Sequence, residues 1–542
     1  MKTYGPVRVD HTPRFYYPWD VLRSRCFWLL APALLALSAV HHFWPPFPSP
    51  NEWPRVYQAL AVVHRGTLAI DEEVHLYGWN EDLSRWGGHL YPNKAPGLLP
   101  LLLPGAWLAH ILAHGSAELS LALYLGRILA VTLPWFFATL ALARFLKRRF
   151  PNAGLALVLA LAYASCWFAY GGMLFAHGFS GAAVCAAVLL ALGDKPSKLA
   201  LFASGFAMGW AVTAEYPLAV LAVLLGCAVL RQAGRSVFWF ALGGLFPLLG
   251  LAYYNSVCFG APWSLSTAHE VTPYYAALSQ RGVFGIGLPT GSGLWLLLFS
   301  PERGLLFWAP LLLFGFLPPR GEKDVLSWFS WLASLAHLLL ISGYPNADGG
   351  WCPGPRYLVA SFPLLAVCAA AFFYRHWHKP WARLTGGVLA LWSVPAAFLP
   401  LASFPLTPPE FPLGPASFHW PLLRDGVVAP GLWLRSAGPV LLLVAVVGLA
   451  LCATAWLASW WPRALGVVAA FALWSPSCAL PPRSFQQELE LAIVRDVWAQ
   501  GDGQWLARLK QQVASPAERK RLASWIWSFE ANKTRTLPAR RP

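Results

Sequence analysis

Charged residues are scarce in this chain of 542 residues, since Asp, Glu, Lys and Arg together make up only 12% of it. Hydrophobic residues make up 57%, the mean hydropathy is +0.50, and long apolar runs recur along the sequence. The core of a soluble domain cannot use this much apolar surface. The composition therefore excludes a soluble globular protein and indicates an all-α polytopic membrane protein.

Cysteine patterns that signal chemistry are also missing. Most of the nine cysteines lie inside apolar runs, where the thiol serves as a small hydrophobic group. No CxxC motif and no Cys/His spacing supports a zinc site. We therefore predict no metal site and no cofactor, although the acidic triplet Asp71, Glu72 and Glu73 leaves open the binding of a divalent cation.

The net charge of +16 does not point to nucleic acid, because Lys and Arg occur in short clusters at the ends of apolar runs. Such clusters mark the cytoplasmic ends of spans, so we expect membrane lipids and no nucleic acid as partners. Residues 1–25 are basic, and the apolar run that follows has no small-residue cleavage site. We expect a cytoplasmic N-terminal segment, 1–25, and a retained first span.

With about 20 residues for each span, the apolar runs predict about thirteen spans. These are residues 26–44, 119–143, 153–171, 179–193, 198–214, 217–230, 236–254, 304–318, 325–342, 357–374, 384–402, 438–459 and 464–480. They form a transmembrane domain, 26–480, whose first external loop is 45–118. Within this loop we interpret 97–113 as a helix at the external interface, because a span there would move the basic cluster at 144–149 outside.

The tail, 481–542, differs from the rest because it is charged. Leu489, Ile493, Val494 and Trp498 follow a helical spacing within it. We predict a small amphipathic appendage that lies on the membrane or caps the external face.

The first loop collects charge in a chain that has little. Asn51 is a suitable N-cap, Pro54 is tolerated in a first helical turn, and Gly66 is a suitable stop, so we predict a surface helix between them. Glu52 falls in its first turn, where the helix dipole and Arg55 favour the carboxylate over the acid. An ionised Glu52 can act as a base; the alternative is a capping residue paired with Arg55.

Several motifs of this loop occur in a known order. They are Glu52-Trp-Pro-Arg55-Val-Tyr57, Arg65-Gly66-Thr67-Leu68, Gly88-His-Leu-Tyr91 and Lys94-Ala-Pro-Gly97. The pattern resembles the first external loop of lipid-linked-sugar glycosyltransferases with the GT-C fold, above all the protein mannosyltransferases and the aminoarabinose transferases that modify lipid A. Residues 298–305 and 349–357 look like motifs of a bacterial branch of the same superfamily.

The resemblance implies a GT-C-like bundle that transfers a sugar from a polyprenyl-phosphate donor to a hydroxyl of a glycan, lipid or protein, with inversion. The reaction belongs to the cell envelope, on the external face of a bacterial inner membrane. Glu52 stands at the position of the family's catalytic aspartate, and Lys94 at that of the residue that meets the lipid phosphate. The other residues expected to bind substrate are Arg55, Tyr91, His177, Arg303, Asp348, Trp351, Arg356 and Tyr357.

Some of these assignments have structural alternatives. Arg303 and Arg356 lie in external loops close to span ends, at the depth of a lipid headgroup, where fixed cations can meet a phosphate. His177 stands where the family has a second acid, and a histidine at a helix end is often only structural. Asp348 either shapes the sugar pocket or forms a turn in Asn346-Ala-Asp348-Gly-Gly.

Two other function classes are open. A polytopic transporter or lipid flippase without transferase activity would place charges along several spans, whereas here they crowd into the loops. A scaffold protein has no need for a lysine at Lys94 and an acid at Glu52 in one loop.

Overall fold

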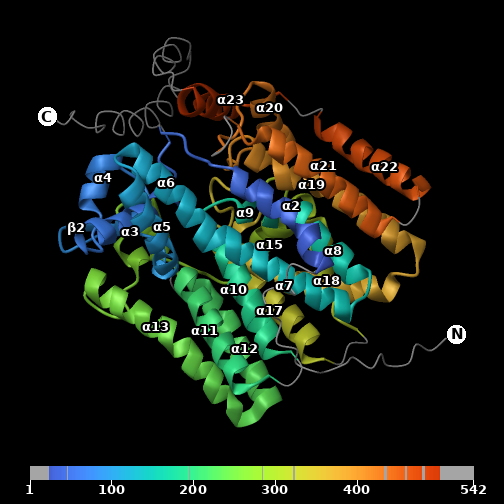
Figure 1. The fold of residues 1–542 in the computed structure, drawn as a ribbon, viewed down its shortest axis with the longest axis horizontal. Coiled ribbons are helices and arrows are strands. Elements are labelled where there is room, and N and C mark those ends of the chain that lie inside the picture. The colour runs from blue at the N-terminus through green and yellow to red at the C-terminus, as the bar shows by residue number, and fades with distance from the viewer. Residues whose placement is uncertain are drawn as a thin grey trace.

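The computed structural model describes residues 24–500, except residue 46 and segments 194–195, 283–284, 321–323, 432–435, 458–459 and 479–481. The predicted segment 1–25 lies outside the described residues up to residue 23, and so does the tail beyond residue 500. Helices dominate the described chain, and a single two-stranded sheet accompanies them there (Figure 1).

Six helical segments of the described chain are long and apolar enough to cross a membrane. They are Ser116–Arg149, Tyr216–Phe259, Val325–Ser342, Arg356–His376, Pro380–Ala402 and Gly438–Trp456. Shorter apolar helices are Arg25–Ala39, Pro96–Leu112, Ala153–Tyr163, Ala176–Ala191 and Lys198–Ala214. The chain is a helical, polytopic integral membrane protein, as the composition predicts, and the number of spans stays a prediction.

Helices occupy most of the predicted spans. They are α2 (Arg25–Ala39), α6 (Ser116–Arg127), α7 (Leu133–Arg149), α10 (Ala176–Ala191), α11 (Lys198–Ala214), α12 (Ala219–Ala233), α13 (Val237–Phe259), α17 (Val325–Ser342), α18 (Phe362–His376), α19 (Pro380–Ala402), α21 (Gly438–Trp456) and α22 (Trp460–Cys478). A short π-helical segment, Ile128–Thr132, joins α6 to α7.

Two predicted spans are interrupted by non-helical residues. Residues 153–171 divide into α8 (Ala153–Tyr163) and α9 (Cys166–Gly171), because Ser165 is extended and its hydroxyl accepts the Trp167 N–H at 3.2 Å. The prediction for 304–318 is wrong in form: α16 (Leu305–Trp308) ends before the 3₁₀ helix Pro310–Phe316. Pro310 lacks an N–H and disfavours helical backbone at the residue before it.

The first loop is well structured. It contains α3 (Trp53–Arg65), α4 (Asp71–Tyr77), the strands β1 (Leu83–Trp86) and β2 (His89–Pro92), and α5 (Leu99–Leu112). The helix α5 confirms that 97–113 is helical, and it packs against α3 and α6. Outside the loop, further short helices are α14 (Pro273–Ser279), α15 (Gly291–Leu298), α20 (Trp420–Arg424) and α23 (Phe485–Ala492).

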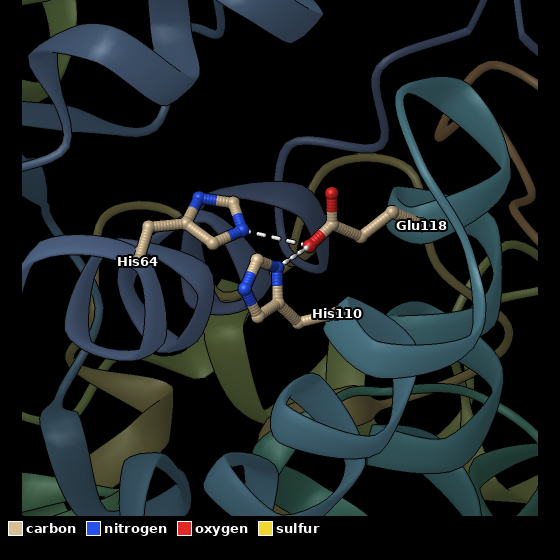
Figure 2. Close-up of side chains that lie close together, drawn as sticks. All are labelled: His64, His110 and Glu118. Atoms are coloured by element: carbon tan, nitrogen blue, oxygen red, sulfur yellow. Dashed lines mark hydrogen bonds and ion pairs between the residues drawn. The ribbon is translucent and has the colours of Figure 1, made fainter.

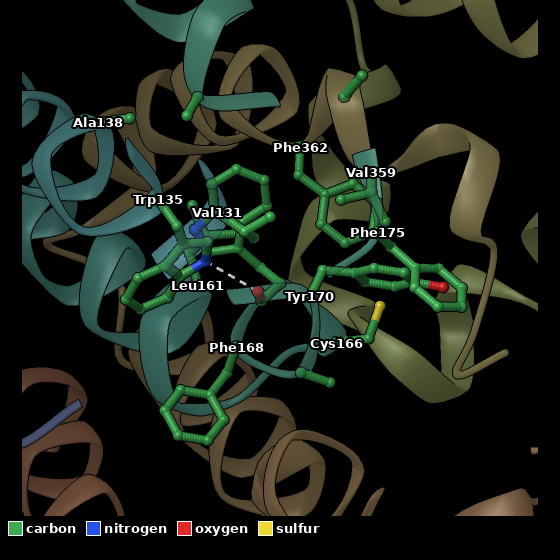
Figure 3. Packing of buried hydrophobic residues seen from close by; sticks show 14 of the residues in the cluster. Val131, Trp135, Ala138, Leu161, Cys166, Phe168, Tyr170, Phe175, Val359 and Phe362 are labelled. Carbon is green, nitrogen blue, oxygen red and sulfur yellow. Dashed lines mark hydrogen bonds between the residues drawn. The ribbon is translucent and has the colours of Figure 1, made fainter. Parts of the chain in front are cut away.

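Aromatic side chains fill the core beside α9 (Figure 3). The indole N–H of Trp135 donates to the Trp167 carbonyl at 2.8 Å, so that a polar group inside the bundle is satisfied. The hydroxyl of Tyr170 donates to the Pro353 carbonyl at 2.9 Å. This bond ties α9 to the loop that leads to Arg356.

Glycines allow helices to approach closely at two places that position the site. A Cβ at Gly205 of α11 would collide with the carbonyl of Phe240 in α13, and one at Gly243 would collide with that of Phe202. A Cβ at Gly97 would lie 2.5 Å from the amide nitrogen of Ala214. The segment that carries Lys94 is therefore seated against the end of α11.

Candidate active site

A cavity of about 1780 Å³ lies where the first loop meets the ends of several helices. Its walls come from the first loop, the starts of α10 and α12, the end of α11, and the segments 265–288, 340–357 and 493–498. Three cations, Arg55, Lys94 and Arg356, lie on this wall together with the acids Glu81, Asp82, Glu215 and Glu270. Charges from distant parts of the sequence thus share one space.

The helix α3 begins and ends close to the predicted points. Pro54 is in its first turn, and Gly66 ends it with φ +66°, where the Gly66 N–H donates to the Val62 carbonyl at 2.9 Å. Both predictions are confirmed. The N-cap is Glu52 rather than Asn51, because the helix starts at Trp53.

Arg55 joins α3 to the segment that carries Lys94. Its Nε donates to the Asn51 carbonyl and one terminal nitrogen donates to the Ala95 carbonyl, both at 3.0 Å. Burial lowers the pKa of Arg55 to about 10, so the guanidinium stays charged at neutral pH. The remaining terminal nitrogen has no hydrogen-bond partner among the described residues, and the side chain lines the cavity.

The β1–β2 hairpin positions Lys94. Leu83 pairs with Pro92 at its open end, and Gly87 and Gly88 make the turn with φ values of +58° and +87°. Just beyond β2, the Lys94 ammonium lies 2.9 Å from a carboxylate oxygen of Asp82. The lysine is therefore held at the cavity wall by Asp82.

Glu270 faces the same part of the cavity from a distant segment. The side-chain amide of Asn93 donates to Glu270 at 2.8 Å and to Asp82 at 3.2 Å. Burial raises the pKa of Glu270 from 4.5 to about 7, against the opposing effect of Lys94. This carboxyl can take up and release a proton near neutral pH.

His177 and Glu215 form a second polar pair on the wall. Nδ1 of His177 lies 2.8 Å from Oε2 of Glu215. Glu215 ends α11, and His177 lies in the first turn of α10. The pair thus brings a carboxylate at the end of α11 next to the imidazole at the start of α10.

Arg356 and Tyr357 also line the cavity. One terminal nitrogen of Arg356 donates to the Tyr357 hydroxyl at 2.7 Å, and the guanidinium carbon is 4.7 Å from the Tyr357 ring centre. The ring of Tyr357 also meets those of His177 and Tyr344 edge-on. The buried Nε of Arg356 has no hydrogen-bond partner among the described residues.

Glu52 is set back from the cavity. Its Oε1 accepts the Leu174 N–H at 2.8 Å, and it is absent from the lining although its neighbours Asn51 and Trp53 belong to it. Burial raises the pKa of Glu52 above its usual value, and Arg127 and Arg55 oppose this only in part. The expectation that the helix dipole and Arg55 favour the charged form is therefore corrected, because desolvation outweighs them.

Arg303 does not reach the cavity, which corrects its predicted role. It is fully buried, and its guanidinium donates to the carbonyls of Asp348, Gly350 and Thr407 at 2.8, 2.6 and 2.9 Å. Asp348 does not line the cavity either. Its carboxylate accepts the Gly350 N–H at 2.8 Å, as expected if Asp348 forms a turn. Both residues shape the loop that presents Trp351 and Arg356.

Tyr91 and Trp351 have different positions. Tyr91 packs edge-on against Phe259 beside Tyr254 and is not part of the cavity lining, and its contact with substrate stays a prediction. Trp351 lines the cavity and meets the ring of Trp498 at 5.6 Å. The start of the tail therefore closes over the cavity, with Ile493 and Val497 on the wall.

The acidic triplet has protein partners. Arg65 binds Glu72 at 3.1 Å and Glu73 as a close pair, and Asp71 accepts the Leu90 N–H at 3.1 Å. A different cluster, His64, His110 and Glu118, brings three possible metal ligands together (Figure 2). It lies outside the cavity lining.

Sequence reasoning missed Glu270 and Asn93. Asn93 is the residue before Lys94, so its position beside the motif was the signal available. Glu270 had no such signal, because contacts between distant parts of the chain, such as the pairing of Ser84 with Glu270, bring that segment to the hairpin.

No family model matches this chain, and no curated protein matches it by sequence. Among solved structures it is similar to ArnT from Cupriavidus metallidurans in the apo state, with 16% identity and a TM-score of 0.44 over 83% of this chain and 77% of that one. ArnT bound to undecaprenyl phosphate gives 15% identity and 0.44, over 84% and 78%. The apo oligosaccharyltransferase of Archaeoglobus fulgidus gives 12% and 0.35, over 91% of this chain and 60% of that chain.

Proposed function

We propose that this chain is a membrane glycosyltransferase that moves a sugar from a polyprenyl-phosphate donor to an acceptor hydroxyl on the external face of a bacterial inner membrane. The observation that carries the proposal is the meeting of Arg55, Lys94 and Arg356 on one cavity wall beside carboxylates. The motifs of the first loop, which resemble those of GT-C enzymes, support it independently.

The cations suit a phosphate leaving group. When the bond between sugar and phosphate breaks, negative charge grows on the phosphate and must be met by fixed donors. Arg356 keeps its Nε without a protein partner, and the planar guanidinium matches phosphate oxygens. Lys94 is held only by Asp82, so a phosphate of higher charge can replace that acid.

The size of the cavity also supports a lipid-linked donor. Pockets for drug-sized ligands measure about 300–1,000 Å³. This cavity has about 1780 Å³ and combines apolar side chains such as Leu288, Leu340 and Leu406 with the cations. It has room for a sugar phosphate, part of a prenyl chain and an acceptor.

For the base we propose Glu52, which stands at the position of the family's catalytic aspartate. The acceptor hydroxyl must lose a proton as it attacks, and one positioned carboxylate contributes about 10²–10⁴ in rate. Burial raises the pKa of Glu52 above its usual value, and a carboxylate with a higher pKa is a stronger base. Its neighbours Asn51 and Trp53 line the cavity, so the carboxylate lies just behind the wall and must leave the Leu174 N–H to reach an acceptor.

A second candidate for the base is Glu270. It already lies on the wall, and its pKa of about 7 suits proton transfer near neutral pH. The variants Glu52→Gln and Glu270→Gln distinguish the two, because only the variant of the true base loses transfer while it still binds the lipid phosphate.

The binding half of the proposal is tested with undecaprenyl phosphate and the purified full chain. We expect the lipid phosphate to raise the melting temperature of the wild type, because a ligand that binds only the folded state stabilises it. Lys94→Ala and Arg356→Ala should lose most of this increase. Arg85→Ala is the matched control, since Arg85 is an exposed cation of the same hairpin outside the lining.

An increase that is equal in all four proteins would contradict the phosphate site. So would an increase in the wild type that an uncharged prenyl alcohol reproduces, because the cations would then have no part in it.

A further inference from the structure

His64, His110 and Glu118 come from three different helices and meet at one point (Figure 2). His64 lies in the last turn of α3, His110 in the last turn of α5, and Glu118 in the first turn of α6. His64 and Glu118 stand 54 positions apart in the sequence. The three residues form no metal-binding motif in the sequence, and this is why the sequence predicts no metal site.

The two imidazoles converge on a single carboxylate oxygen. Nε2 of His64 lies 2.7 Å and Nδ1 of His110 lies 3.0 Å from Oε1 of Glu118. An ion bound at about 2.0–2.2 Å from each ligand keeps such atoms roughly 3–3.5 Å apart. Only a small movement of the side chains is needed to place an ion between them.

A second layer of polar groups lies behind the cluster. Nδ1 of His64 lies 3.6 Å from Oε1 of Glu73, and Arg65 holds Glu73 in turn. A carboxylate behind a histidine is typical of metal sites, because it fixes the tautomer that leaves the other nitrogen free for the ion. The side chain of Glu73 is fully buried, so this support is built into the fold.

The cluster is enclosed on two sides and open on the third. The side chains of Glu118 and His64 are 7% and 15% exposed, whereas that of His110 is 47% exposed. A bound ion would thus have three protein ligands and access to water for a fourth. Two histidines and one carboxylate are a common ligand set for zinc.

We propose that His64, His110 and Glu118 bind a divalent transition-metal ion of the zinc class. The ion would fasten the ends of α3 and α5 to the start of α6 and so brace the first loop. Tyr77, which belongs to the cavity lining, lies close to Glu118 of this brace. The site does not depend on the proposed transferase activity.

The test uses the full chain without a histidine tag, freed of metal with a chelator and then titrated with Zn²⁺. We expect about one Zn²⁺ per chain by elemental analysis, and a melting temperature that rises with Zn²⁺ but not with Mg²⁺. His110→Ala and Glu118→Gln should bind Zn²⁺ at least about tenfold more weakly, since even the loss of an outer group such as Glu73 costs about 10–100-fold.

His75→Ala is the control, because His75 is an exposed histidine of the same loop outside the cluster. Its Zn²⁺ affinity should equal that of the wild type. The proposal is overturned if the wild type binds no stoichiometric Zn²⁺, or if His110→Ala and Glu118→Gln keep the wild-type affinity. His110 is half exposed, so its variant should fold and keep this comparison valid.

Discussion

Arg303 and Arg356 show how burial separates two arginines that look alike in the sequence. Both precede a span and stand near glycine, so both were expected to meet a phosphate. The guanidinium of Arg303 donates its hydrogen bonds to backbone carbonyls. Arg356 lines the cavity instead, and its Nε has no hydrogen-bond partner in the part of the chain that the structure describes. The partners of a side chain depend on loop geometry, which residue type alone does not specify.

The carboxyl of Glu270 should make stability depend on pH. In the unfolded chain it loses its proton near pH 4.5, and in the folded chain near about pH 7, because burial raises its pKa. Between these values the native state binds more protons, so the free energy of unfolding falls as pH rises. Glu270→Gln cannot ionise and should remove this part of the dependence.

The measurement is the melting temperature of wild type and Glu270→Gln from about pH 5 to about pH 8. The wild type should lose stability relative to the variant as pH rises. Two curves that stay parallel would show that Glu270 does not titrate in this range.

At the scale of helices and strands, local signals in the sequence were sufficient where the chain obeys local rules. Gly66 ends α3 as predicted. The helix α5 forms within the segment 97–113, which the sequence predicts to be helical. The apolar run 304–318 does not form one continuous α-helix, because Pro310 disfavours helical backbone at the residue before it. Hydropathy measures how apolar a segment is, and it does not report whether its backbone continues as a helix.

The close contact of α11 with α13 should be sensitive to one methyl group. Gly205→Ala places a Cβ against the carbonyl of Phe240, and overpacking of this kind costs about 1–3 kcal/mol. Gly250→Ala is the control within α13, since a Cβ there meets nothing within 4 Å. We expect a lower melting temperature for the first variant alone; equal values for both would contradict this packing.

At the scale of the whole molecule, the candidate site is a product of tertiary structure. The motifs of the first loop located Arg55 and Lys94, and the later motifs located Arg356, but none of them shows that these residues share a cavity. Glu215 and Glu270 join the site only through the packing of α10, α11 and the hairpin. A lipid flippase would also need a large cavity with cations, so the breaking of the bond between sugar and phosphate is what separates the two functions.

The most direct test of the proposed transfer is release of polyprenyl phosphate by the full chain in lipid vesicles. The vesicles contain a panel of polyprenyl-phosphate sugars with lipid, glycan and peptide acceptors. We predict release with one donor, and a loss of about 10²–10⁴-fold in Glu52→Gln, with undecaprenyl phosphate still bound. Full activity in that variant together with loss in Glu270→Gln would move the base to Glu270. Intact donors throughout, or donors carried unchanged across the membrane, would contradict the transferase.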